Sequence, residues 1–182
     1  IEHGCWMDEA AADMMAEAGT YFVPTMGNFY TSVANSHKAG NREQLEFKIR
    51  EIIEPHRKSV AMAYEKGICI ATGTDTNGNL VDEVVLLHGV GMKPMEAIQA
   101  ATRNAARVLG LEEEVGTLRP GKMADIIVVE ENPLEDLSQL RNVRHVVRAG
   151  ERVGADWFVN LDDSMKFSPL NFLQEEACEY GL

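Results

Sequence analysis

The chain has 182 residues, 45% hydrophobic and 25% charged, proportions typical of a globular domain with a sizeable core. Its formal net charge of −12 argues against a nucleic-acid partner, because phosphate binding needs clustered Lys and Arg. No apolar run approaches the ~20 residues of a membrane span, so we expect no membrane partner. The scattered Cys5, Cys69 and Cys178 form neither a disulfide framework nor a zinc knuckle. They indicate reduced thiols and a cytoplasmic protein.

Short apolar segments alternate with helical segments over the first 110 residues. We predict strands at Ile1–His3, Tyr21–Pro24 and Ile68–Ala71, and helices from Asp8 to Gly19, Glu43 to Lys66, Val81 to Val90 and Pro94 to Gly110. A polar loop is expected from Gly27 to Asn41, and Pro55 should kink the second helix. This alternation is typical of parallel βα units whose strands are buried on both faces.

Beyond Gly110 the pattern changes to that of a small β-domain. A strand is predicted at Ala124–Glu130, and Val143–Val153 is typical of a hairpin that turns at Ala149–Glu151. The expected organisation is βα units over residues 1–110, part of a β-sandwich domain over 111–153 and a C-terminal tail over 154–182.

Two chemically active side chains follow predicted strands. His3 ends the first strand and Asp75 follows the third. In a parallel α/β barrel the carboxyl ends of the strands form the catalytic face, and imidazole and carboxylate together suit a divalent metal such as zinc. From spacing alone, a hydrogen-bonded core histidine and a capping aspartate are equally good interpretations.

The other histidines have simpler interpretations. His37, in the predicted loop, and His56, next to Pro55, are expected to be solvated; His88 should pack or hydrogen-bond on its helix, and His145 should face solvent. A calcium loop beginning at Asp75 is rejected, because Leu80 occupies its glycine position and Leu86 its bidentate glutamate position.

Several motifs, in order along residues 1 to about 153, resemble the amidohydrolase superfamily. They are residues 1–4 (IEHG), 23–25 (VPT), 71–75 (ATGTD), 91–97 (GMKPMEA), 100–106 (AATRNAA) and 116–125 (GTLRPGKMAD). The resemblance is greatest to imidazolonepropionase-like and Xaa-Pro dipeptidase-like members. It implies an α/β fold made of the last three βα units of a TIM-like barrel, followed by part of a small β-sandwich domain.

The resemblance also implies roles for single residues. His3 corresponds to a metal ligand at the end of the sixth barrel strand. Asp75 corresponds to the aspartate that ends the eighth, which binds metal and acts catalytically by shuttling a proton to the leaving nitrogen. Thr25 would end the seventh strand close to the substrate. Tyr30, in the predicted loop after it, is a second candidate for substrate contact.

The expected activity is hydrolysis of a C–N bond in a small amide, cyclic amide or dipeptide by a metal-activated water. Zinc or another divalent metal, as one or two ions, would be the cofactor. The family's His-x-His, lysine and further histidine have no counterpart in the chain, which opens directly on a strand end. We therefore expect a C-terminal fragment that is inactive alone, since catalytic zinc needs three protein ligands.

The alternative is a non-catalytic or oligomerising domain that retains the second half of the fold. The exposed edges of three barrel strands would pair with another copy, as a homo-oligomer, or with the missing N-terminal half.

Overall fold

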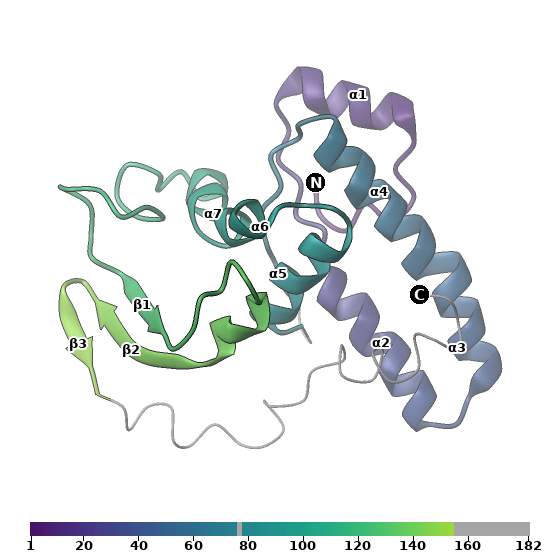
Figure 1. Ribbon diagram of the computed structural model, residues 1–182. Helices are drawn as coiled ribbons and strands as arrows, with labels where there is room; N and C mark the ends of the chain where they lie inside the picture. The colour runs from purple at the N-terminus through teal and green to yellow at the C-terminus, as the bar shows by residue number, and fades with distance from the viewer. Residues whose placement is uncertain (76–77, 155–182) are drawn as a thin grey trace.

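The computed structural model describes residues 1–75 and 78–154, in which helices predominate (Figure 1). The α-helices are α1 (Glu9–Ala18), α2 (Met26–Lys38), α3 (Arg42–Lys48), α4 (Glu54–Glu65), α5 (Leu80–Gly89), α6 (Pro94–Ala100) and α7 (Arg103–Val108). A π-helical turn η1 (Ile49–Ile53) joins α3 to α4, and a 3-10 turn η2 (Leu137–Arg141) lies among the strands β1 (Ile126–Val129), β2 (Val143–Arg148) and β3 (Glu151–Val153). No helix among the described residues is both long and apolar enough to cross a membrane.

The three predicted N-terminal strands are short parallel segments paired side by side. Glu2 pairs with Val23, and Phe22 pairs with Ile70, both in parallel. The middle segment therefore lies between the other two, because Val23 N–H donates to the Ile1 carbonyl and Phe22 N–H to that of Cys69. Helices connect the segments, as the sequence predicts for consecutive βα units. All three carboxyl ends therefore point the same way.

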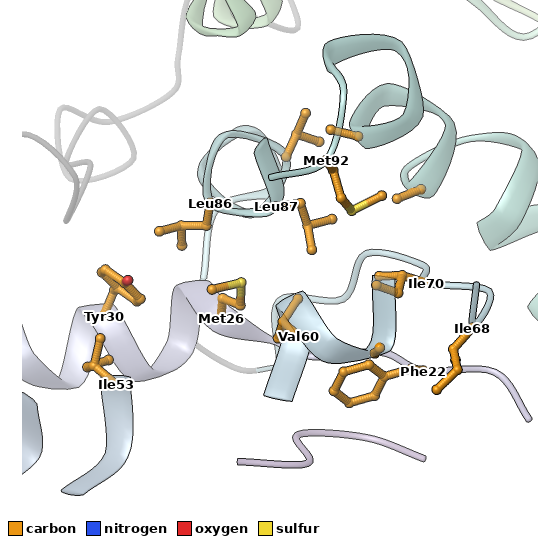
Figure 2. Packing of buried hydrophobic residues seen from close by; sticks show 14 of the residues in the cluster. Phe22, Met26, Tyr30, Ile53, Val60, Ile68, Ile70, Leu86, Leu87 and Met92 are labelled. Carbon is orange, nitrogen blue, oxygen red and sulfur yellow. The ribbon is translucent and has the colours of Figure 1, made fainter. Parts of the chain in front are cut away.

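The core forms where these segments meet α2, α4 and α5. Phe22 and Leu87 are fully buried, and Ile70 is nearly so. Figure 2 shows them facing Met26 of α2 and Val60 of α4 across a continuous apolar cluster. The expected burial on both faces does not hold for the first segment, where Ile1 is 61% exposed, whereas Phe22, Ile70 and Ala71 of the other two are buried.

The polar loop expected from Gly27 to Asn41 is wrong: most of it is helix α2. Tertiary contacts outweigh the weak helix propensity of its Gly, Asn and Ser residues. The Glu83 carboxylate of α5 accepts the first backbone N–H groups of α2. The Lys48 ammonium of α3 donates to the hydroxyl groups of Ser32 and the buried Ser36 of α2.

Pro55 is accommodated by a change of helix type just before it. The turn η1 ends two residues before this proline, and a π-helical turn relieves the clash between the proline ring and the preceding turn. Pro55 has no N–H for the Glu51 carbonyl, four residues earlier, and the Trp6 indole N–H donates to that carbonyl at 3.0 Å. The predicted kink is therefore a π-helical turn held by the loop that follows His3.

The helix predicted from Pro94 to Gly110 begins at Pro94 but divides at residues 101–102 into α6 and α7. The carbonyl of Ala100, the last residue of α6, accepts the Thr72 N–H at 3.1 Å. On α7, the Asn104 side chain donates to the Ile70 carbonyl at 2.8 Å. Both bonds hold the strand that leads to Asp75, one from each of the two helices.

The segment predicted to belong to a β-domain contains an antiparallel sheet in the order β1-β2-β3, and Figure 1 shows this sheet to one side of the helices. The predicted hairpin is confirmed, and its two turn residues, Ala149 and Gly150, both have positive φ, the pattern of a type I′ turn. Arg141 of η2 pairs with the buried Asp82 of α5, which connects this region to the helices.

Replacing Gly4 with alanine should destabilise the protein far more than the same change at Gly19. Both glycines have φ near +60°, but a Cβ at Gly4 would lie 2.7 Å from the buried Phe22 ring, whereas nothing lies within 4 Å at Gly19. We expect Gly19→Ala to cost about 1 kcal/mol of unfolding free energy and Gly4→Ala about 1–3 kcal/mol more. Urea denaturation measures both; equal losses would contradict the close packing of Gly4 against Phe22.

Candidate active site

The carboxyl ends of the three parallel segments share an unusual backbone conformation. His3, Thr25 and Asp75 have φ of 65°, 54° and 53°, and among non-glycine residues in the described part of the chain only Ala149 also has positive φ. Left-handed backbone costs a non-glycine residue about 1–2 kcal/mol, and for a β-branched threonine it is a genuine outlier. Strain of this kind concentrates where function demands a particular side-chain direction. All the residues that the sequence predicts for the site, apart from Tyr30, therefore lie at strained positions.

The His3 ring is held by the neighbouring strand. Its Nδ1 shares a hydrogen bond of 2.7 Å with the buried Thr25 hydroxyl, and its edge meets the Phe29 ring with centroids 5.8 Å apart. In the described part of the chain no hydrogen bond is made to Nε2. One ring nitrogen is therefore fixed by a second residue, which is how protein metal sites orient a histidine ligand.

The side chain of Asp75 is held by helix α2. The Asn28 side-chain amide, in the first turn of α2, donates to Asp75 Oδ2 at 2.8 Å, and Asp75 itself is exposed. The first turn of α2 thus contacts His3 through Thr25 and Asp75 through Asn28. The structure brings both predicted metal ligands to one place, the N-terminus of α2.

The donor chemistry fits part of a divalent-metal site. Zinc and related ions take imidazole nitrogen and carboxylate oxygen. In each proposed ligand one polar atom, Nδ1 of His3 or Oδ2 of Asp75, already makes a protein hydrogen bond. Within residues 1–75 and 78–154, however, no three His, Cys, Asp or Glu side chains converge as a metal-binding group.

His56 corrects a second expectation. Predicted to be solvated, its side chain is 1% exposed, and neither ring nitrogen has a hydrogen-bond partner among the described residues. It packs against Phe29, with ring centroids 4.8 Å apart, so Phe29 lies between His56 and His3. Burial lowers the pKa of His56 to about 4. Proximity to Pro55 suggested an irregular, exposed segment, but the π-helical turn lets the helix continue and faces His56 inward.

Tyr30 also differs from expectation. It lies on α2 rather than in a loop, its side chain is 4% exposed, and its hydroxyl accepts a hydrogen bond from Arg57 at 3.1 Å. Burial raises the pKa of this hydroxyl. Figure 2 shows Tyr30 beside Ile53, on the far side of Met26 from Phe22 and Ile70. The prediction of a loop residue is wrong because helical periodicity turns the Tyr30 ring into the core.

The remaining histidines lie outside this cluster. His37 is in the last turn of α2, not in a loop. His88 bonds the Met92 carbonyl through Nδ1 at 2.7 Å, as its predicted hydrogen-bonding role requires. His145 is exposed on β2, as predicted. Cys5 and Cys69 are free thiols, whereas Cys178 and the predicted tail from residue 155 onward lie outside the described residues.

Glu83 is a site residue that the sequence did not reveal. It lies on α5, is fully buried, and accepts hydrogen bonds from the N–H groups of Met26 at 2.9 Å and Gly27 at 2.7 Å. Burial raises its pKa to about 7, and the two backbone bonds oppose that rise. A glutamate amid apolar helix residues, directly after another acid, was the available signal, since buried carboxylates need dedicated partners.

Comparison with known proteins decides the family. The amidohydrolase family profile matches residues 1–153. The chain belongs to the amidohydrolase family. Ochratoxinase of Aspergillus niger is 34% identical over 158 residues, which is 83% of this chain and 33% of that protein. Imidazolonepropionase of Symbiobacterium thermophilum is 32% identical over 130 residues, 70% of this chain and 27% of that protein.

A solved structure agrees with this assignment. The crystal structure of a Xaa-Pro dipeptidase with methionine bound in its active site is 39% identical, superimposes with a TM-score of 0.74, and covers 85% of this chain and 39% of that one. The predicted resemblance to imidazolonepropionase-like and dipeptidase-like amidohydrolases is confirmed, as is the TIM-barrel-type α/β class. This amidohydrolase chain spans about a third of the length of the curated relatives it matches.

Replacing His56 with leucine should flatten the acid dependence of stability. The folded-state pKa is about 4 against 6.5 for an ordinary histidine. The contribution of the neutral, buried His56 ring to the free energy of unfolding is therefore fully present above pH 6.5, and it is lost as the pH falls through 4. Its loss should amount to on the order of 3 kcal/mol. Urea denaturation from pH 7 to 4 measures it, with the exposed His145→Gln as control. A His56→Leu variant as acid-sensitive as the wild type would contradict the buried, neutral ring.

Proposed function

We propose that this chain contributes His3 and Asp75 to the metal site of an amidohydrolase that cleaves a C–N bond in a small amide, cyclic amide or dipeptide. The observation that carries the proposal is the shared anchoring of the two side chains. Each follows a parallel strand segment in a strained backbone conformation, and each is bonded by the first turn of α2. The metals bound by amidohydrolases and the donor types present make zinc the first candidate.

The proposed division of labour follows from the geometry. A bound divalent ion would supply Lewis acidity toward the substrate carbonyl and lower the pKa of water. His3 would bind through Nε2 while Thr25 holds Nδ1. Asn28 occupies Oδ2 of Asp75 and leaves Oδ1 for the metal or a proton. Because Asp75 is exposed at the strand end, it can take a proton from water and deliver it to the leaving nitrogen.

The number of ligands limits what this chain does alone. A catalytic zinc site has three protein ligands and an open position, and His3 with Asp75 supply two. We therefore propose that residues 1–110 correspond to the last three βα units of the barrel and that other polypeptide supplies the remaining ligands. The isolated chain would then be inactive. Similarity to ochratoxinase, imidazolonepropionase and Xaa-Pro dipeptidase supports a C–N bond as the target.

A non-catalytic or oligomerising domain is the second candidate. It is favoured by the lack of a three-donor metal group in the described residues and by the exposed side chains of Ile127 and Val128 on the edge strand β1. A second copy pairing through such an edge would form a homo-oligomer.

Zinc should bind the 182-residue chain weakly, and the two proposed ligands should account for the binding. His3→Gln and Asp75→Asn should each lower the affinity by roughly 10–100-fold or more, since even supporting residues of metal sites have effects of that size. Competition titration with a chromogenic chelator measures it, with His145→Gln and Asp136→Asn as controls. Equal affinity in all five proteins would refute the ligand assignment, and tight stoichiometric binding would refute the two-ligand limit.

A chimera tests the activity. This chain would replace the aligned segment of the Xaa-Pro dipeptidase, and zinc-loaded chimera would be assayed on Xaa-Pro dipeptides, N-acyl amino acids and cyclic amides. We expect hydrolysis of at least one substrate class, no hydrolysis by the chain alone, and a loss of about 10²–10⁴-fold in kcat on Asp75→Asn. A folded, zinc-loaded chimera that hydrolyses none of these substrates would favour the non-catalytic alternative.

A further inference from the structure

The first backbone N–H groups of α2 are not capped by the N-cap side chain, as they are in most helices. A helix normally uses its N-cap side chain to accept one of them. Here the N-cap residue is Thr25, in a left-handed conformation, and its side chain makes no capping hydrogen bond. Its hydroxyl instead bonds His3 Nδ1. The Thr25 hydroxyl, which could cap α2, is thus bonded to His3 of the candidate site.

Glu83 supplies the missing acceptors from another helix. One carboxylate oxygen accepts the Met26 N–H and the other accepts the Gly27 N–H. These are the first two residues of α2, directly between Thr25 and Asn28. A negative charge at a helix N-terminus is also favoured by the helix dipole. Glu83 and Met26 are both fully buried, so the intact side chain shields these bonds from water.

The helix that carries Glu83 is itself fixed. Asn79 caps α5 by accepting the Val81 N–H at 2.9 Å, and the neighbouring Asp82 pairs with Arg141 of η2. Arg141 also donates to the Asn79 side chain at 3.3 Å. The Glu83 carboxylate is therefore presented from a helix anchored at its first turn.

We infer that Glu83 is the positioning residue of the candidate site: by capping α2 it frees the Thr25 hydroxyl to orient His3 and holds Asn28 against Asp75. The inference rests on the proposed function for its metal-binding consequence. Its structural part, the control of the His3 ring by Glu83, does not depend on any metal. Without Glu83, two buried N–H groups would lack acceptors, and the Thr25 hydroxyl occupies the N-cap position, from which a threonine side chain ordinarily accepts such groups.

The experiment compares four variants of the 182-residue chain. Glu83→Ala removes both acceptors, Glu83→Gln keeps one oxygen, and Thr25→Val removes the hydroxyl from His3 directly. Val84→Ala is the matched control, because it truncates a buried side chain next to Glu83 and weakens packing without changing the cap. Long-range ¹⁵N NMR of the histidine rings, without metal, reports the hydrogen bond and tautomer of His3, and urea denaturation confirms that each variant is folded.

We expect Thr25→Val and Glu83→Ala to move the His3 ring nitrogens toward the values of an unrestrained, tautomer-averaged imidazole. Glu83→Gln should lie between these and the wild type, and Val84→Ala should leave the ring unchanged. In chelator competition, Glu83→Ala should lower the zinc affinity by about 10–100-fold.

Two results would overturn the inference: a His3 ring that is unchanged in Glu83→Ala, or one that changes equally in Val84→Ala. The metal role is judged separately. If the His3 ring responds as expected while His3→Gln binds zinc as well as the wild type does, the positioning by Glu83 stands and the proposed metal site fails.

Discussion

The parallel pairing of three short segments is the constraint on which the rest of the molecule depends. The segment containing Phe22 and Val23 hydrogen-bonds to a neighbour on each side, and Gly4 fits against the Phe22 ring where no side chain could. Because the segments are parallel, their carboxyl ends lie at one edge, and helices must return the chain between them. The positions of His3, Thr25 and Asp75 follow from this pairing. The π-helical turn before Pro55 and the break between α6 and α7 both serve to keep these segments in place.

The N-terminus of α2 holds the side chains of the candidate site at this shared edge. Thr25 and Asn28 contact the two proposed ligands, and Glu83 supports the backbone between them. Each bond is unremarkable alone, at roughly 1 kcal/mol, and those to a charged group at roughly twice that. Together they offset strained backbone at three positions. A site assembled this way depends on helix α5 and, through Arg141, on the region of strands β1 to β3, neither of which supplies a proposed ligand.

The family of the chain and its possible activity rest on different observations. The family follows from motifs distributed over residues 1–153. Activity depends on the number and arrangement of ligands, and the described residues bring together an imidazole and a carboxylate but no third donor. The solved Xaa-Pro dipeptidase and ochratoxinase structures both superimpose on this chain, with TM-scores of 0.74 and 0.68, so the shared fold does not by itself identify a substrate.

The sequence by itself determined the order of parallel strands and helices, the β-hairpin with its turn, and the placement of His3 and Asp75 at strand ends. These features are local, because apolar runs, glycine stops and turn residues act over a few neighbours. Only the tertiary structure decided that residues 26–38 are helical, that His56 and Tyr30 are buried, and that Glu83 caps α2. Each of these depends on groups 27 to 57 positions away in the chain, such as Tyr30 with Arg57 and Met26 with Glu83. A residue's local pattern carries no record of such a distant partner, so burial and capping emerged only once the chain was folded.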